Sequence, residues 1–352
     1  MVFHLLPMTF LLFLLLSSPN LALPANDYHG GHEAPLVRML YEYPEGTWLE
    51  NIAIRESGEL VITHLEKPQL DQFNPLQQDA EPEVVYTFMG YLAASGIAEI
   101  APDSFTVAVG NFTFTGGGLQ GSWGIWDVAF GTAGNSQASV DEIGPILEAN
   151  FPDGMCKLPS SGSPNDILYG DIKTGVIWHF DATTGTHEVV LNNTLTAAAT
   201  DPIFGASGVN GMHVVDGILY FVNTAKGLFV SVPVDPNGTP TGDATIIYQS
   251  NQSEEVLYFD DFAIKGNDAY LVTGSGNSIE RIGLDGTHKG RIIAGSLNST
   301  QFAEPTSCAF GRTEKDSNIL YVITAGGLAA PVEGNITVGA QILAVDTSRW
   351  EC

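Results

Sequence analysis

Basic residues are scarce in this 352-residue chain. It contains 13 Lys and Arg against 40 Asp and Glu, which gives a formal net charge of −27 at pH 7. So negative a surface repels nucleic-acid phosphates and anionic lipid headgroups, and we therefore expect no binding to DNA, RNA or an acidic membrane. Charged residues make up only 15% of the chain and hydrophobic residues 44%, enough apolar material for a sizeable core.

Cysteine is almost absent as well. Cys156, Cys308 and Cys352 permit at most one internal disulfide. We expect that bridge between Cys308 and Cys352, because both fall in the last of the repeats described below. One bridge cannot build a domain of this size, so hydrophobic packing must hold it together. The chain also lacks Cys-x-x-Cys pairs, a zinc-ligand cluster and a serine nucleophile elbow.

Long hydrophobic runs are missing apart from one near the start. Leu11–Leu16 consists almost entirely of Leu and Phe and is followed by Ser17, Ser18 and Pro19. This is the pattern of a secretory signal cleaved near Ala22 or Ala25, and the run is too short for a comfortable membrane span. We predict a signal peptide over 1–22, an extension over 23–34 and one domain over 35–352. A retained anchor is the alternative.

Glycosylation sequons agree with a secreted protein or one in the lumen of the secretory pathway. Six Asn-x-Ser/Thr triplets occur, at Asn111, Asn192, Asn237, Asn251, Asn298 and Asn335.

A repeat is the strongest feature of the sequence. Its copies contain a short apolar strand, a turn, a strand rich in Leu, Tyr and Val, a glycine-containing turn and a strand that ends in Asp, as in Gly211–Asp235. The first strands begin near residues 51, 97, 155, 212, 262 and 307, so the period is close to the roughly 40–50 residues of a propeller blade. We therefore predict an all-β fold, a six-bladed β-propeller.

The two chain ends offer a way to close the ring. The seven residues from Asp346 to Cys352 are too few for another turn and strand, whereas the strand-like segment Leu36–Tyr43 stands before the first repeat. We expect this segment to add the outermost strand of the last blade, which leaves only short, protected edges.

Polar residues recur just before the innermost strands, whose ends surround the axis of a propeller. In order they are Glu50-Asn51, Ser95-Gly96, Asp153-Gly154, Asn210-Gly211, Asp260-Asp261 and Glu304 with Thr306. Such a ring suits a hard cation such as Ca²⁺, and equally suits anchoring or proton transfer on a small molecule. Asp, Asn and Gly are also ordinary turn residues, and that interpretation stays open.

These segments carry a family resemblance. Pro152-Asp153-Gly154-Met155 and Val209-Asn210-Gly211-Met212 resemble the gluconolactonase and senescence-marker-protein superfamily of propellers. That resemblance implies a divalent metal on the axis, with Glu50, Asp153, Asn210 and Asp261 as ligands. Ser95, where an Asn is expected, departs from the pattern.

A second resemblance is narrower. Gly46–Asn51, Asn210–His213 and Asp260–Ala263 are similar to secreted propellers of fungal secondary-metabolite clusters, some of which resemble hetero-Diels–Alderases. It implies a coupling, without a redox cofactor, between a tropolone-type quinone methide and a sesquiterpene alkene such as humulene. Glu50, Asp153, Asn210 and Asp261 are then the catalytic candidates.

Such a coupling needs apolar walls and a few polar groups, and therefore takes small hydrophobic substrates. The residues that we expect to contact them are Trp48, Asn51, Trp123, His213, Tyr258 and Phe259. The Gly-rich insertion Asn111–Trp126 has the length to fold over a mouth of the tunnel, and Ala325–Gly339 is expected to be a solvated loop.

Three hypotheses follow. The first is a cofactor-independent cyclase of the hetero-Diels–Alder type, for which no cofactor is required. The second is a lactonase or esterase that depends on Ca²⁺ or another divalent metal held by Glu50, Asp153, Asn210 and Asp261. The third is a propeller that binds a partner without catalysis, because a fold alone does not decide function.

Overall fold

The computed structural model describes residues 37–131, 138–158, 166–203, 205–250, 258–286 and 290–348. These residues belong to one compact unit, Ala34–Cys352. The predicted signal peptide, the extension, Asn251 and Cys352 lie outside the described residues. No helix in the described part has the length and hydrophobicity needed to cross a membrane.

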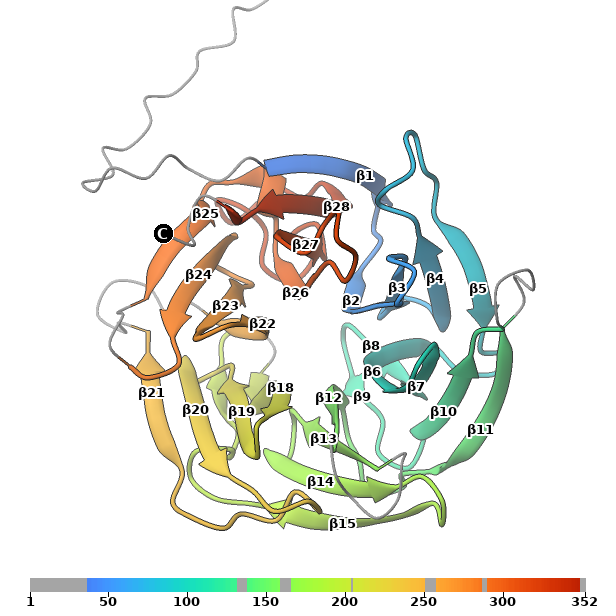
Figure 1. Cartoon of the computed structure of the whole chain (residues 1–352), viewed down its shortest axis with the longest axis vertical. Helices are drawn as coiled ribbons and strands as arrows, with labels where there is room; N and C mark the ends of the chain where they lie inside the picture. Colours follow the sequence, from blue (N-terminus) through green and yellow to red (C-terminus); the bar gives the residue numbers. More distant parts are fainter. Residues whose placement is uncertain are drawn as a thin grey trace, which may run out of the picture. The chain divides into compact units, whose positions relative to one another are not determined.

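The described residues form six four-stranded sheets arranged around an axis, together with two short two-stranded sheets (Figure 1). The six-bladed all-β propeller is therefore confirmed. Blades 1 and 2 consist of β2 (Leu49–Ile54), β3 (Leu60–His64), β4 (Gln69–Phe73) and β5 (Glu83–Thr87), then β6 (Ala93–Ala101), β7 (Ser104–Gly110), β10 (Gly124–Ala129) and β11 (Ser139–Pro145). Blades 3 and 4 consist of β12 (Pro152–Lys157), β13 (Ile167–Asp171), β14 (Val176–Asp181) and β15 (Thr186–Leu191), then β18 (Val209–Val215), β19 (Ile218–Asn223), β20 (Leu228–Pro233) and β21 (Thr245–Gln249). Blades 5 and 6 consist of β22 (Phe259–Lys265), β23 (Asp268–Thr273), β24 (Ser278–Gly283) and β25 (Arg291–Gly295), then β26 (Pro305–Phe310), β27 (Ile319–Thr324), β28 (Gly339–Asp346) and β1 (Val37–Glu45).

The ring closes through the first strand, as predicted. β1 pairs antiparallel with β28, in a register that sets Val37 opposite Val345 and Tyr41 opposite Ile342. Figure 1 shows β1 on the outer edge of blade 6, beside the end of the chain's last strand. This pairing covers the edge of β28 and joins the first and last strands of the chain in one blade.

The core lies between the blades. Buried apolar side chains of the described residues gather in six clusters. Five of them each join two neighbouring blades, and the sixth joins blades 2 and 3 and also includes Trp48, Leu65 and Ala325 from blades 1 and 6. Cys308 belongs to the cluster between blades 5 and 6, where its thiol donates a weak hydrogen bond to the carbonyl of Tyr270. Its predicted partner Cys352 lies outside the described residues, so the disulfide stays a prediction.

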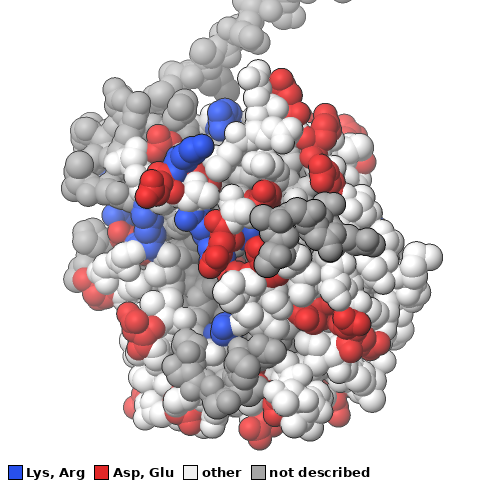
Figure 2. Space-filling model, turned by 45° about the vertical axis from the view of Figure 1, so that its right-hand side comes forward, with Lys and Arg blue, Asp and Glu red and all other residues white. Residues whose placement is uncertain are grey.

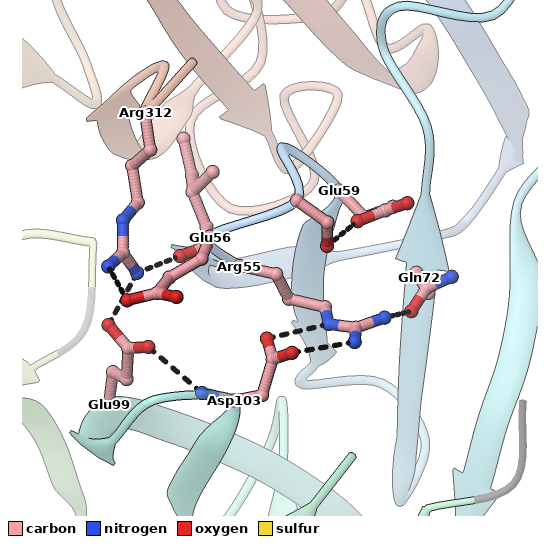
Figure 3. A network of polar contacts seen from close by, with 9 residues as sticks. Arg55, Glu56, Glu59, Gln72, Glu99, Asp103 and Arg312 are labelled. Atoms are coloured by element: carbon pink, nitrogen blue, oxygen red, sulfur yellow. Dashed lines mark hydrogen bonds and ion pairs between the residues drawn. The ribbon is translucent and has the colours of Figure 1, made fainter. Parts of the chain in front are cut away.

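Ion pairs tie blades 6, 1 and 2 at the end of β2 remote from Glu50 (Figure 3). The Arg55 guanidinium donates two hydrogen bonds of 3.0 Å to the Asp103 carboxylate and a third of 2.9 Å to Gln72. Arg312, from the turn after β26, pairs with Glu99 of blade 2 and donates to the carbonyl of Ile54 in blade 1. These contacts join the first and last blades, and planar guanidinium groups suit such paired contacts.

Two hairpins extend beyond the blades on the side of Glu50 and Asp153, where both contribute to the cavity described below. One is formed by β8 (Phe112–Thr113) and β9 (Gly117–Gly118), within the Gly-rich insertion, and the other by β16 (Ala199–Asp201) and β17 (Gly205–Ser207). A single 3₁₀ turn, Thr300–Phe302, precedes β26.

Candidate functional site

Each innermost strand contains a β-bulge at the same place. The pairing register shifts between Leu49 and Ile52 in β2, and equivalent shifts occur in β6, β12, β18, β22 and β26. A bulge inserts an extra residue and redirects side chains. The polar residues singled out in the sequence occupy these bulges, except Glu304, which lies just before β26. The strands therefore begin two to four residues earlier than predicted, and the residues in the bulges are not turn residues.

The bulges open onto a cavity of about 630 Å³ at the axis. Four of them each give one polar side chain to its lining, namely Glu50, Asp153, Asn210 and Asp260. Apolar side chains supply much of the remaining wall: Trp48, Leu65, Phe112, Phe114, Phe151, Ile172, Ile203, Leu328 and Ala329. Further polar residues include Lys173, Ser207 and Thr224. The cavity therefore combines a polar floor with aromatic and aliphatic walls, the composition of a small-molecule site.

Each floor carboxyl is held by a nitrogen donor. The Trp48 indole N–H donates to Glu50, and the Asn51 amide donates to Asp153 at 2.6 Å. The Asn210 amide donates to Asp260 at 2.7 Å. Glu50 and Asp153 are buried, whereas Asp260 is partly exposed to the cavity. The carboxyl groups therefore have fixed orientations before any ligand arrives.

Burial raises the pKa values of all three carboxyls, and the charges of neighbouring carboxylates add to each shift. Burial raises the pKa of Asp153 to about 7, although hydrogen bonds from Glu50 and Asn51 oppose the shift. The pKa of Glu50 lies well above its usual range because of burial first, then the charges of Asp153 and Asp260. The pKa of Asp260 is raised in the same way. Three acids so placed cannot all ionise near neutral pH, so the floor keeps protons that it can donate.

A chain of buried polar groups supports Trp48 from behind. The Trp48 backbone N–H donates to Glu66 at 3.0 Å, and Glu66 lies 3.2 Å from Nδ1 of His64. The other His64 nitrogen lies 2.9 Å from Asp71, which also accepts a hydrogen bond from the Tyr43 hydroxyl. Burial alone would lower the pKa of His64, but hydrogen bonds to Asp71 and Glu66 raise it overall. A satisfied network of this kind fixes the Trp48 wall.

Asp171 organises the opposite wall. Its buried carboxylate accepts hydrogen bonds from four backbone N–H groups, those of Asn150, Phe151, Lys173 and Thr174. The first two precede β12, and the last two form the turn after β13. One side chain therefore sets the positions of the Phe151 ring and of Lys173, both of which line the cavity.

Asp261 does not share the cavity with the other three predicted catalytic residues. It follows Asp260 in the β22 bulge, and its carboxylate accepts a hydrogen bond from the Ser307 hydroxyl at 2.6 Å. His213 lies 3.5 Å from the same carboxylate, donates towards the Phe262 carbonyl and does not line the cavity. The structure thus brings Glu50, Asp153 and Asn210 together with Asp260 in place of Asp261.

The predicted contact residues divide similarly. Trp48 lines the cavity, and Asn51 acts behind it through its hydrogen bond to Asp153. Trp123 is buried in the core, where its indole N–H donates to the Asn150 carbonyl at 2.9 Å, and Phe259 is buried between blades 4 and 5. Tyr258 is half-buried and is not among the lining residues. Trp123 and Phe259 are therefore packing residues, because large aromatic rings fill inter-blade space.

Several lining residues were not predicted. Phe112 and Phe114 belong to the insertion that was expected to fold over a mouth, and Phe151 directly precedes the Pro152-Asp153-Gly154 motif. Leu328 and Ala329 correct the expectation of a solvated loop at 325–339, since both pack against the cluster around Trp48. Glu304, behind that loop, accepts a hydrogen bond from the Ala329 backbone N–H at 2.9 Å.

The predicted metal ligands do not form one set in this arrangement. Asp261 is engaged by Ser307 outside the cavity, and one oxygen of each floor carboxyl already accepts a hydrogen bond, from Trp48, Asn51 or Asn210. Within the described residues, no three His, Cys, Asp or Glu side chains are grouped so that they could hold a metal ion.

Two known proteins are similar in sequence to this chain. "Putative hetero-Diels-Alderase asR5" of Sarocladium schorii is 26% identical over 349 residues, which cover 89% of this chain and 84% of that protein. "Putative hetero-Diels-Alderase" of a Phoma species is 26% identical over 345 residues, covering 91% and 93%. No protein-family model matches the chain.

Solved structures show the same fold. A luciferin-regenerating enzyme superposes with a TM-score of 0.62 at 15% identity, covering 88% of this chain and 95% of that one. The calcium-binding regucalcin of Agrobacterium tumefaciens gives 0.57 at 14% identity, covering 90% and 95%. At these identities the likeness concerns the architecture. The predicted resemblance to both groups of propellers is thereby confirmed, and the named sequence relatives favour an enzyme of biosynthetic, cyclase-like character that acts on small molecules.

Proposed function

We propose that this propeller joins two small molecules by an intermolecular hetero-Diels–Alder reaction in the axial cavity, without a redox cofactor. The observation that carries the proposal is that three carboxyls with raised pKa values and a set of aromatic walls line one cavity of about 630 Å³. The similarity to two proteins named as hetero-Diels–Alderases supports it.

The floor carboxyls suit the generation of a heterodiene. Glu50 or Asp153 donates a proton to the hydroxyl of a hydroxymethyl precursor, which leaves as water. The neighbouring enol or phenol hydroxyl gives its proton back to the carboxylate, so that a carbonyl and an exocyclic methylene remain. The acid is regenerated and no electrons are exchanged. A protonated carboxyl near the new carbonyl oxygen then withdraws electron density from the diene.

The walls suit the second partner. The cycloaddition forms one C–C and one C–O bond, and it needs no further proton or electron transfer. Its barrier falls when two reactants are held in contact and aligned, because the entropy of bringing them together has already been lost on binding. Phe112, Phe114 and Phe151 offer an apolar surface for an alkene. The pair that the resemblance implies is a tropolone-type quinone methide and a humulene-like sesquiterpene.

The Glu50→Gln variant tests the acid. We expect coupling from the hydroxymethyl precursor to slow by about 10²-fold or more, within the usual contribution of general acid catalysis. Gln matches protonated Glu in shape and can still accept the Trp48 N–H, so folding should persist. Product formation is followed by chromatography and mass spectrometry with EDTA present throughout, and the exposed-site variant Glu188→Gln is the control.

An unchanged rate in Glu50→Gln would remove Glu50 from the mechanism. Loss of all activity in EDTA, together with metal-restored lactone hydrolysis, would replace the proposal with the metal-dependent lactonase. Tight binding of both reactants with no coupling above the background would favour a binding propeller.

We also propose that the mature protein is secreted or resides in the secretory lumen. Four sequon residues are exposed, Asn192, Asn237, Asn298 and Asn335, whereas Asn111 is half-buried and its side-chain oxygen is enclosed. We expect glycans at the exposed positions and none at Asn111, as checked by peptide mapping after N-glycosidase treatment of protein from a eukaryotic host. Occupancy at Asn111 with the four others bare would contradict this pattern.

A further inference from the structure

One side chain gives the cavity a charge opposite to that of its floor. Among the described residues that line it, Lys173 is the only one with a positive charge. The chain has 13 Lys and Arg against 40 Asp and Glu, and the visible face in Figure 2 shows scattered acidic side chains and fewer basic ones, most of them in its upper left part. An ammonium group in this particular wall is therefore a conspicuous feature of the site.

The structure holds Lys173 in place from both ends. Its backbone N–H donates to Asp171, the residue that also fixes Phe151. Its ammonium group donates to the carbonyl of Ala206 in β17 at 3.1 Å, beside the lining residue Ser207. The Lys173 side chain therefore bridges the turn after β13 and the β16–β17 hairpin, at the edge of the cavity.

The surroundings leave this ammonium group incompletely solvated. Burial lowers the pKa of Lys173, while the charges of Asp201 and Asp171 act to raise it. Both carboxylates also accept other hydrogen bonds, Asp201 from the Ser207 hydroxyl and Asp171 from four backbone N–H groups. A partly desolvated cation interacts more strongly with an anion than the same cation does in water.

We propose that Lys173 binds an anionic oxygen of the ligand, so that the substrates of this cavity include an apolar molecule with an acidic hydroxyl or carboxyl group. A hydrocarbon forms no favourable electrostatic interaction with an ammonium group. An oxyanion loses its hydration on entering the cavity, and an ion pair with Lys173 replaces that lost interaction. The inference rests on the proposed function, to which it adds a specificity-determining residue. The oxygenated reactant binds at Lys173, and the alkene binds against the aromatic wall.

Two fluorescent probes that differ by one anionic group test the inference. They are 8-anilino-1-naphthalenesulfonate and N-phenyl-1-naphthylamine, titrated at fixed ionic strength into wild type, Lys173→Met and Lys173→Arg. Lys226→Met is the matched control, since Lys226 also donates to backbone carbonyls but does not line the cavity. We expect wild type and Lys226→Met to bind the sulfonate at least tenfold more tightly than the neutral probe.

Lys173→Met should lose that preference while its Kd for the neutral probe stays within twofold, and Lys173→Arg should restore part of it. A preference retained in Lys173→Met, equal weakening of both probes, or no preference in wild type would overturn the inference. Coupling assays on the same samples separate the two proposals. Coupling with an unchanged probe preference refutes only the role of Lys173, whereas a Lys173-dependent preference without coupling refutes only the proposed reaction.

Discussion

The protein should lose stability as the pH rises from about 5 to about 8. The folded state raises the pKa of Asp153 from 3.8 to about 7, so between these values the folded chain holds a proton that the unfolded chain has released. Stability must then fall with increasing pH, and for this one carboxyl the full loss is on the order of 4 kcal/mol. Glu50, Asp260 and Glu304 also have raised pKa values and act in the same direction.

The histidines add to this trend. Hydrogen bonds to carboxylates raise the pKa values of His64 and His213 despite burial, which alone would lower them. Their contribution is present at low pH and is lost as the pH rises through the folded-state pKa. The lowered pKa of Asp71 has its effect below 3.8, outside this window.

Denaturant unfolding at pH 5.5 and pH 8.0 measures the effect. Wild type should have the larger free energy of unfolding at pH 5.5, and Asp153→Asn should reduce the difference, because the amide cannot ionise. Asp243→Asn, at an exposed position, should leave it unchanged. Equal stability at the two pH values, or greater stability at pH 8.0, would show that the floor carboxyls do not retain protons.

The second large effect is expected at Gly154. This glycine sits in the β12 bulge, and a Cβ built on it would overlap the carbonyl of Asn210 and the Cα of Gly211 in the next blade. A Cβ built on Gly96 or on Gly211 would likewise overlap atoms of the next blade. We expect Gly154→Ala to lower the free energy of unfolding by about 3 kcal/mol, because only backbone could move to relieve the overlap.

The matched control is Gly144→Ala in β11, where the nearest atom to a built Cβ lies 3.8 Å away. Its stability should stay within about 0.5 kcal/mol of wild type. Gly154→Ala should also weaken ligand binding. Gly154 directly follows Asp153 in the chain, and the added Cβ would push against the backbone of Asn210, so both lining residues would be displaced. Equal stabilities for the two variants would mean that blades 3 and 4 do not meet at the axis as described.

The architecture could be predicted because it repeats. Alternating apolar residues and recurring turns mark each blade, and the strand-like segment Leu36–Tyr43 before the first repeat indicated the closing strand. The sequence also showed that the polar pairs recur at the same position in each repeat. The sequence did not show that these pairs occupy β-bulges, because a bulge is defined by pairing with a neighbouring strand rather than by local sequence.

This limit explains why the sequence pointed to Asp261, whereas the structure places Asp260 in the lining of the cavity. Within a bulge, two successive residues face different surroundings, and Asp260-Asp261 contains the same residue type twice. Sequence alone cannot tell which carboxyl reaches the cavity. In the β12 and β18 pairs the second member is Gly, so only Asp153 and Asn210 had a side chain to contribute.

The walls were harder to predict than the floor. Leu328 and Ala329 reach the cavity from a loop whose composition resembles a solvated one, held in part by the hydrogen bond from Ala329 to Glu304. Lys173 is placed by Asp171, whose four backbone contacts join segments before β12 and after β13. Such contacts depend on tertiary structure and leave no periodic signal.

The stereochemistry of the coupled product tests the central claim most directly. The purified protein would be incubated with the quinone-methide precursor and the alkene, and the enantiomeric ratio of the adduct would be compared with that of the reaction without protein. If the cavity aligns both reactants, one stereoisomer should dominate at a faster rate, and Glu50→Gln should return the rate towards the background. A racemic adduct formed at the background rate would contradict the assignment of this cavity as a cyclase site.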